Sequence, residues 1–202
     1  MSTFLETLRE QRRDDHRYYH HSRINQSLHL FSAISFLVSY GLLFKDPAIA
    51  ALVAWLVAMT SRQIGHFFFE PKGYDEVNQA THEYKEAIKV GYNLRRKVVL
   101  MGIWAAIPVG LLMSPTLFGL LPDGIVSQGW WRSMGAAWLA LGIAGVVLRT
   151  LHLFYLQDVR TGLAWATKIL TDPFHDIRLY WKSPFHLLRG QLIDPMRARH
   201  DA

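Results

Sequence analysis

Apolar residues along this chain gather into four long blocks, and most of the charged residues lie between the blocks. The blocks cover about residues 28–44, 48–70, 98–121 and 130–156. A helix needs about 20 residues to cross a hydrocarbon core of about 30 Å, and no block alternates with the period of two that a membrane β-strand shows. The pattern therefore predicts an all-α polytopic membrane protein with four transmembrane helices. A buried soluble bundle is disfavoured because the blocks are apolar on all sides.

The positive charges predict the orientation of these helices. Lysine and arginine are frequent before the first block, between the second and third blocks, and after the fourth block. The turn after the first block has only Lys45, and the turn after the third has no basic residue before Arg132. Because basic segments stay on the cytoplasmic side, we expect both termini and the central segment to be cytoplasmic. The net charge of +6 then faces anionic lipid, and no nucleic-acid partner is expected.

The segment after the fourth block differs in composition from the blocks. Pro173, Pro184 and Pro195 interrupt it, and aromatic residues alternate with arginine and lysine. Proline breaks helices, and mixed aromatic and basic side chains are typical of the headgroup region of a membrane. We therefore predict a four-helix transmembrane domain over residues 1–157. A cytoplasmic or interfacial tail, broken into short pieces, would follow over residues 158–202.

Histidine is unusually frequent in this sequence, and cysteine is absent. The ten histidines are His16, His20, His21, His29, His66, His82, His152, His175, His186 and His200. All of them fall on the side that the charge pattern makes cytoplasmic, and none lies in the two outer turns. Without cysteine, a metal ion would need nitrogen and oxygen ligands. The one-sided distribution predicts a metal site at the cytoplasmic membrane interface.

The first group of candidate ligands lies at the start of the first predicted helix. His21, Asn25 and His29 are spaced at i, i+4 and i+8, which places them on one helix face. His20 points in a different direction. Residues eight positions apart are separated by about 12 Å along a straight helix, so both histidines cannot bind one ion. Either the helix bends near residues 22–23, or the histidines bind two ions, or one of them only supports a ligand.

The second group lies at the end of the second predicted helix. Gln63, His66 and Glu70 are spaced at i, i+3 and i+7 and share one face. Gly65 would let another helix approach closely beside His66. His66 and Glu70, together with His29 of the neighbouring helix, would form a set of two histidines and one carboxylate. Such a set is the ligand type of non-haem iron(II) oxygenases.

Further polar residues near the cytoplasmic helix ends have both a functional and a structural reading. His82 and His152 are candidate extra ligands, whereas a surface position would explain His82 and a packing role would explain His152. Arg62 either extends to the interface or pairs with the carboxylate of a substrate. Arg95 and Arg96, with the lysine that follows them, are alternative candidates for binding that carboxylate.

These motifs resemble those of a known family. YYHH, the asparagine and histidine that follow it, and the run RQIGHFFFE resemble the fungal-type 2-hydroxy fatty acid dioxygenase family, over about residues 16–70. The matching positions are Tyr19, His20, His21, Asn25, His29, Gln63, Gly65, His66, Phe69 and Glu70. The resemblance implies a small four-helix membrane enzyme that uses iron(II) and O2 to remove one carbon from 2-hydroxy fatty acids. This reaction is a step of the alpha-oxidation route that degrades sphingoid bases.

The expected site follows from the motifs and the resemblance together. The candidate iron ligands are His20 or His21, His29 and His66, with Glu70 as a ligand or as the partner of one. Asn25 and Gln63 are expected to orient the ligands. The acyl chain would lie between the helices and enter from the bilayer. The site would face the cytoplasm, in a bacterial inner membrane or an endoplasmic reticulum.

Two other functions fit parts of the sequence. Membrane di-iron lipid hydroxylases and desaturases also gather histidines on the cytoplasmic side of four helices, but they carry HxxxH and HxxHH boxes. Here His20 and His21 are adjacent, and no HxxHH box is present. A lipid-binding protein without enzymatic activity is the third reading. The number of metal ions per chain would separate the three readings.

Overall fold

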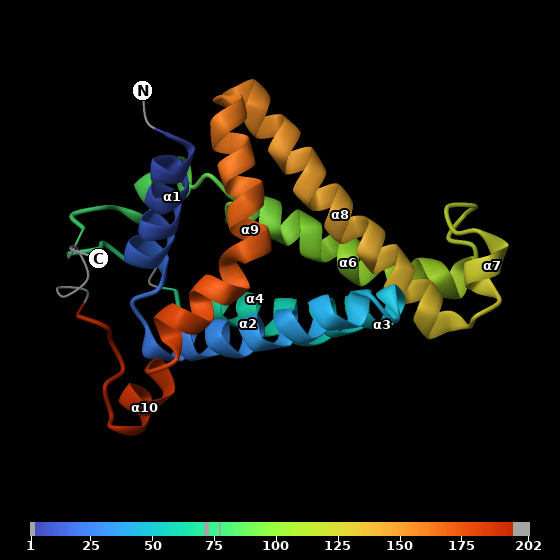
Figure 1. The fold of residues 1–202 in the computed structure, drawn as a ribbon, viewed down its shortest axis with the longest axis horizontal. Coiled ribbons are helices and arrows are strands. Elements are labelled where there is room, and N and C mark those ends of the chain that lie inside the picture. Colours follow the sequence, from blue (N-terminus) through green and yellow to red (C-terminus); the bar gives the residue numbers. More distant parts are fainter. Residues whose placement is uncertain (1–2, 71–72, 77, 196–202) are drawn as a thin grey trace.

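The computed structural model describes residues 3–70, 73–76 and 78–195, and these residues form an all-helical array (Figure 1). Its helices are α1 (Phe4–Tyr19), α2 (Arg23–Leu43), α3 (Pro47–Val53), the π-helix η1 (Ala54–Met59), α4 (Thr60–Phe68), α5 (His82–Ile88), α6 (Leu94–Met113), α7 (Asp123–Val126), α8 (Trp130–Leu156), α9 (Val159–Tyr180) and α10 (Ser183–Leu188). About 76% of the chain is helical, and the described residues contain no strand beyond two isolated bridges. The predicted all-α class is confirmed.

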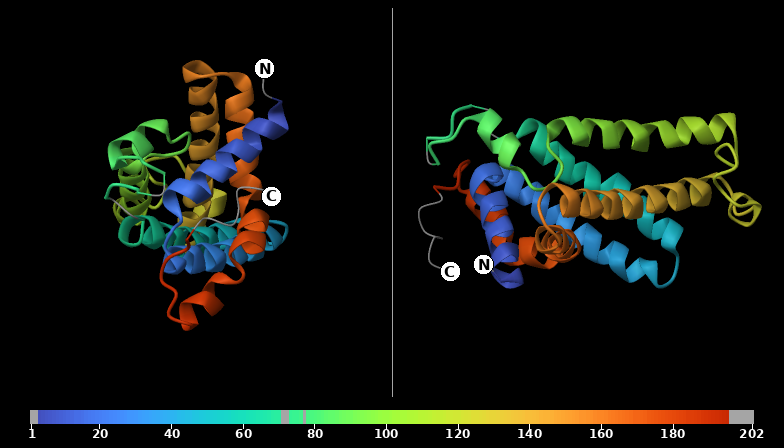
Figure 2. Two further views of the ribbon diagram at one scale, coloured as in Figure 1. Left: turned by 90° about the vertical axis from the view of Figure 1, so that its left-hand side faces the viewer. Right: turned by 90° about the horizontal axis from the view of Figure 1, so that it is seen from above.

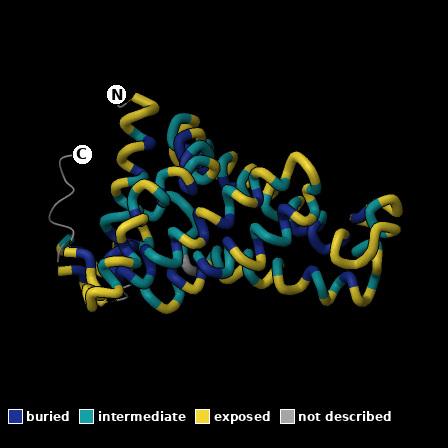
Figure 3. Tube along the Cα trace, turned by 60° about the horizontal axis from the view of Figure 1, so that its bottom comes forward, coloured by how far each residue is buried: buried dark blue, intermediate teal, exposed yellow. Residues whose placement is uncertain are grey.

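Four of these helical segments are long and apolar enough to cross a membrane, as the sequence predicts. They are Arg23–Leu43, Pro47–Phe68, Arg95–Met113 and Trp130–Leu156. Large apolar side chains such as Val38, Val109 and Leu148 are exposed along them, as on a surface that faces lipid. Figure 3 shows the exposed positions on the outer sides of the helices and the buried ones towards the middle. The orientation relative to the cytoplasm stays a prediction.

The third span is shorter than the pattern predicts. The apolar block extends to residue 121, but α6 ends at Met113. Ser114 adopts an extended conformation because the following Pro115 disfavours helical geometry in the residue before it. Pro108 is accommodated within α6, and its missing amide hydrogen leaves one helical hydrogen bond unmade. The prediction that this helix continues to residue 121 is therefore wrong.

The second span changes its helical register halfway along. The π-helix η1 connects α3 to α4 without a break. Hydroxyl groups bond to carbonyls at this point: Thr60 donates to the oxygen of Trp55 at 2.9 Å, and Ser61 donates to that of Val57 at 2.8 Å. A π-segment rotates the residues that follow it around the helix axis. The register of η1 thus determines which face of the span carries the polar residues of α4.

The helices pack mainly around α2 and α8. α2 packs against α3, η1, α4 and α9, and α8 packs against α3, α6 and α9. Tryptophans fill the space between the second, third and fourth spans. The indole of Trp55 donates to the carbonyl of Trp138 at 2.8 Å, and that of Trp138 donates to the carbonyl of Trp104 at 3.0 Å. These bonds satisfy the indole N–H groups inside an apolar cluster.

Most of the segment after residue 157 is one long helix, α9, which corrects the prediction of short pieces, and the short α10 follows it. α9 runs through Pro173 without interruption and packs against α1, α2 and α8. In Figure 1 it extends from the end of α8 to the beginning of α2, and Figure 2 shows α1 beside it. Pro184 lies in the first turn of α10, where a missing amide hydrogen has no cost. The division of the chain at residue 157 stays a prediction.

A sharp turn separates α1 from α2, as one of the three alternatives for the first histidine group requires. α1 ends at Tyr19, and α2 begins at Arg23 with the hydroxyl of Ser22 as its N-cap. The C-terminal segment forms backbone hydrogen bonds to both ends of this turn. The amide of Arg23 donates to the carbonyl of Leu192 at 2.8 Å, and the amide of Asp194 donates to that of His21 at 2.7 Å.

Gly135→Ala tests the contact between α8 and α3. A methyl group at Gly135 would lie 2.3 Å from the carbonyl oxygen of Ala48, which is backbone and cannot rotate away. We expect the free energy of unfolding to fall by about 1–3 kcal/mol, measured as a lower melting temperature in detergent micelles. Gly102→Ala is the control, because a methyl group there meets nothing within 4 Å. Equal melting temperatures in the two variants would contradict this helix contact.

Candidate metal centre

Three imidazoles from three parts of the chain meet at one end of the helix array. His20 comes from the turn after α1, His29 from α2 and His66 from α4. One nitrogen of each ring lies within 4.8 Å of the corresponding nitrogens of the other two. Because α2 and α4 run in opposite directions, the start of the first span and the end of the second lie side by side. Among the described residues, this is the one group of histidine and carboxylate side chains with such spacing.

Two of the imidazoles are buried and that of His66 is partly buried, and several of the ring nitrogens have no hydrogen-bond partner. His29 is fully buried and His20 is 4% exposed. Nε2 of His20 and both ring nitrogens of His29 form no hydrogen bond. Burial and the neighbouring His29 lower the pKa of His20, which favours the neutral ring that metals bind. Buried polar groups without partners are costly, and a shared metal ion would satisfy one nitrogen of each of these rings. The residues present therefore fit a divalent metal with imidazole ligands.

Two of the rings are oriented by hydrogen bonds at their other nitrogen. Nδ1 of His20 lies 2.9 Å from the hydroxyl of Tyr180, and Nδ1 of His66 lies 2.6 Å from Oε2 of Glu70. Each contact leaves Nε2 for the metal. The structure thus places Glu70 as the partner of a ligand, which is one of the two predicted roles. The other oxygen of Glu70 pairs with Lys89 at 3.5 Å.

The close approach of α2 and α4 depends on Gly65, as the sequence predicts. A Cβ atom at Gly65 would lie 2.2 Å from Oδ1 of Asn25 and 3.5 Å from the ring of His29. Asn25 also makes a hydrogen bond that the sequence pattern did not indicate. Its side-chain amide donates to the carbonyl of Tyr19 at 2.9 Å, which fixes the turn that carries His20. The prediction that Asn25 orients the ligands therefore has a specific physical basis.

Three predicted candidate ligands lie outside the group. His21 faces the other way, with its ring 3.5 Å from Asp75. His82 opens α5, and the exposed His152 is hydrogen-bonded to Arg149 at 3.1 Å. The adjacent residues His20 and His21 alternate in direction because they lie in the turn between two helices, where i and i+1 side chains diverge. Of the two adjacent histidines, His20 is the one that lies with His29 and His66.

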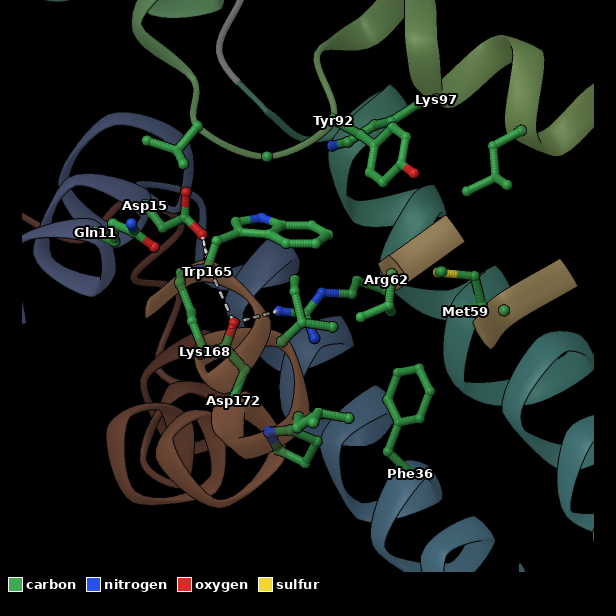
Figure 4. Close-up of a pocket in the computed structure, with 18 of the residues that line it drawn as sticks. Gln11, Asp15, Phe36, Met59, Arg62, Tyr92, Lys97, Trp165, Lys168 and Asp172 are labelled. Carbon is green, nitrogen blue, oxygen red and sulfur yellow. Dashed lines mark hydrogen bonds and ion pairs between the residues drawn. The ribbon is translucent and has the colours of Figure 1, made fainter. Parts of the chain in front are cut away.

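A cavity of about 670 Å³ adjoins two of the three imidazoles. His20 and His66 form part of its wall, and the wall continues between α2, α8 and α9 with mostly apolar side chains. Examples of these apolar lining residues are Phe36, Trp55 and Trp138. The cavity is large enough for a small molecule or part of a lipid chain. Figure 4 shows Phe36 and Met59 on one side of this space, opposite the polar residues of α9.

The polar residues predicted to bind a substrate or orient ligands take different positions. Gln63 lines the cavity, and its side-chain amide donates to the sulfur of Met59 at 3.3 Å rather than to a histidine. Arg62 also lines the cavity but pairs with Asp176 at 3.1 Å. Arg95 is exposed, and neither Arg95 nor Arg96 is among the lining residues. The predicted carboxylate site at Arg95 and Arg96 is therefore not formed in this structure.

The sequence analysis missed a polar face on α9 beside the imidazoles. Lys168, Asp172, Asp176 and Tyr180 follow at intervals of four residues, which places them on one side of the helix. Asp176 lies 3.7 Å from Nδ1 of His29, and Tyr180 contacts His20. The interval was visible in the sequence. It was overlooked because Pro173 suggested a broken helix.

Ion pairs hold α9 and α1 against the site. Lys168 pairs with Asp15 of α1 and, at 3.0 Å, with Asp172. Burial opposes ionisation of Asp15, but the ammonium group of Lys168 outweighs it and lowers the pKa of Asp15 to about 2. Burial raises the pKa of Asp176, whereas the guanidinium of Arg62 acts in the opposite direction. These pairs neutralise charges that would otherwise be buried without compensation.

Separate replacement of the two adjacent histidines tests which one belongs to the site. His20→Gln removes one of the three imidazoles, so we expect it to lose most of its bound metal. His21→Gln leaves the three imidazoles in place and should keep the wild-type content. The measurement is elemental analysis of untagged protein after anaerobic loading with Fe(II) and removal of free metal. Retention in His20→Gln with loss in His21→Gln would reverse the assignment.

Glu70→Gln tests the support of His66. The amide replaces a charged hydrogen-bond acceptor with a neutral one, so we expect about 10–100-fold weaker metal affinity. Affinity is measured by competition with a chelator. Glu86→Gln is the control, because Glu86 pairs with the same Lys89, at 3.4 Å, from the neighbouring α5. Equal effects of the two substitutions would show that the general loss of negative charge, rather than the bond to His66, is responsible.

Comparison with known proteins adds no relative to this description. No family model, no curated protein and no solved structure matches the chain. A function for the chain therefore has to be inferred from the residues of the site and their geometry.

Proposed function

We propose that this chain is a membrane iron(II)-dependent dioxygenase that shortens 2-hydroxy fatty acids by one carbon. The observation that carries the proposal is the group of three imidazoles, two of which line a cavity of about 670 Å³ whose remaining wall is largely apolar. A metal centre and a space for a hydrocarbon chain thus adjoin each other. The choice of iron and of this substrate class comes from the resemblance of the motifs around His20, His29 and His66 to the fungal-type family.

His20, His29 and His66 would hold the metal, and all three bind as neutral rings. Three protein ligands leave coordination positions for O2 and a substrate, and bound iron(II) would supply O2 activation and attraction for a hydroxy acid. The overall reaction balances as R–CHOH–COOH + O2 → R–COOH + CO2 + H2O. O2 is the four-electron oxidant, and the bond between carbons one and two breaks.

The protein's own residues have supporting functions in this proposal. Tyr180 and Glu70 keep the rings of His20 and His66 in one orientation through their Nδ1 atoms. Apolar side chains such as Trp55 and Trp138 exclude water from the cavity and provide a surface for the acyl chain. Entry between the helices from the bilayer suits a lipid substrate. The site would lie on the cytoplasmic side, where the charge pattern places the start of the first span.

The single group of imidazoles favours the mononuclear reading over the di-iron reading. Di-iron membrane enzymes need two ligand sets, and the described residues bring together one set of three. A lipid-binding protein without enzymatic activity shares the cavity but gives no reason for three adjacent imidazoles with unpartnered nitrogens. Both alternatives make different predictions for metal content.

Turnover and metal content together test the proposal. We expect about one iron per chain and O2-dependent conversion of a 2-hydroxy fatty acid to CO2 and the acid one carbon shorter, detected by mass spectrometry. His66→Ala should lose both iron and turnover while still inserting into the membrane, because one of three ligands is gone. His152→Ala, which removes an exposed histidine outside the group, is the control.

Other results for metal content and turnover would support a different site or one of the other two functions. Full iron content and turnover in His66→Ala would show that the site is assigned wrongly. Two metal ions per wild-type chain would support the di-iron enzyme. No metal in the wild-type protein, even after anaerobic loading, would support the lipid-binding protein.

A further inference from the structure

The cavity beside the imidazoles contains four positively charged side chains, and their partners differ. They are Arg62, Lys89, Lys97 and Lys168. Arg62 pairs with Asp176 at 3.1 Å, Lys168 pairs with Asp172 at 3.0 Å, and Lys89 pairs with Glu70 at 3.5 Å. Within the part of the chain that the structure describes, Lys97 has no carboxylate within 4.0 Å. Among the described residues, the charge of Lys97 therefore has no carboxylate counterpart at ion-pair distance.

Lys97 lies on a different side of the cavity from Lys168. It lies in the first turns of α6, at the same end of the array as the imidazoles. Figure 4 shows it beside Tyr92, away from the ion pairs of Lys168 and Asp172 on α9. Its charge also acts on Glu70, the partner of His66. Burial raises the pKa of Glu70, and the ammonium groups of Lys89 and Lys97 act against this effect.

Besides the charged groups whose fields act on Lys97, apolar side chains form much of the cavity wall. Leu100 follows one helical turn later on α6, and Trp55, Met59 and Trp138 lie along the same cavity. An ammonium group surrounded by such residues gains from an anion, because a charge removed from water is costly without a partner. Apolar walls of this kind favour a hydrocarbon chain. One cation at the end of an apolar cavity thus matches an amphiphile with one anionic head group.

We propose that Lys97 binds the carboxylate of a single-chain fatty acid whose hydrocarbon chain lies along the apolar wall. This inference places the head group of the substrate near His66. Its meaning for catalysis therefore rests on the proposed function. A carboxylate suits a single ammonium, whereas a phosphate is typically bound by an arginine fork or by several donors. Arg62 is unsuited to this function because binding a substrate would break its pair with Asp176.

A binding experiment with full-length, iron-loaded protein in nanodiscs tests this inference without measuring turnover. The probes are radiolabelled hexadecanoic acid, hexadecanol and hexadecyl phosphate, and empty nanodiscs give the background partition. Lys97→Met keeps a similar side-chain length but removes the charge. We expect its affinity for the acid to fall about tenfold or more, since hydrogen bonds to charged groups have this strength. Its affinity for the alcohol should stay unchanged.

Arg95→Met is the matched control, because it removes an exposed charge two residues earlier in the same helix. It should bind the acid like the wild type. Lys97→Gln serves as a second variant if Lys97→Met is not monodisperse in gel filtration. Equal loss of acid and alcohol in both Lys97 variants, or no loss of the acid, would overturn the inference. Tighter binding of hexadecyl phosphate than of the acid would overturn the carboxylate as the head group.

The same measurement on metal-free protein separates this inference from the proposed function. If acid binding depends on Lys97 but the chain never retains iron, the inference stands as a fatty-acid site and the dioxygenase proposal fails. If iron binds to the three imidazoles but acid binding is indifferent to Lys97, the dioxygenase proposal stands and this inference fails.

Discussion

The burial of polar side chains among apolar helices is the constraint that organises one end of this protein. Polar side chains buried there gain from bonding to one another, and several residues near the imidazoles do so. Tyr180 bonds to His20, Glu70 bonds to His66, and Lys168 pairs with Asp15 and Asp172. The unpartnered ring nitrogens of His20 and His29 depart from this rule. Buried polar groups are usually satisfied, and these unbonded nitrogens belong to two of the three imidazoles that lie close together, so together they indicate where a metal ion would bind.

The same constraint explains why segments distant in sequence converge. Polar faces come from the turn before α2, from two antiparallel spans and from α9. None of these faces could be buried without the others. Gly65 permits the contact between the two spans because it places no Cβ atom against Asn25. The C-terminal segment then bonds to the backbone of the turn, through Leu192 and Asp194. The position of His20 thus depends on residues from both ends of the chain.

Much of the fold and part of the site could be predicted from the sequence. The four apolar blocks are long and continuous, so their helices follow from length alone, and the spacing around His66 and Gly65 indicated a shared face and a close contact. The end of α6 was predicted too late because an apolar run does not show where Pro115 stops a helix. The choice between His20 and His21 required the turn, since neighbouring residues in a turn point in different directions and spacing on a straight helix does not apply.

The polar face of α9 shows why a local signal can mislead about function. Pro173 suggests a break, because proline removes one backbone donor and clashes with the preceding turn. Packing against α1, α2 and α8 outweighs this penalty, and the helix continues far enough to bring Asp176 and Tyr180 to the imidazoles. The four-residue interval from Lys168 to Tyr180 has meaning only if the helix is continuous. Tertiary packing thus decides whether these residues form one face, and with it whether the imidazoles have the partners that orient them.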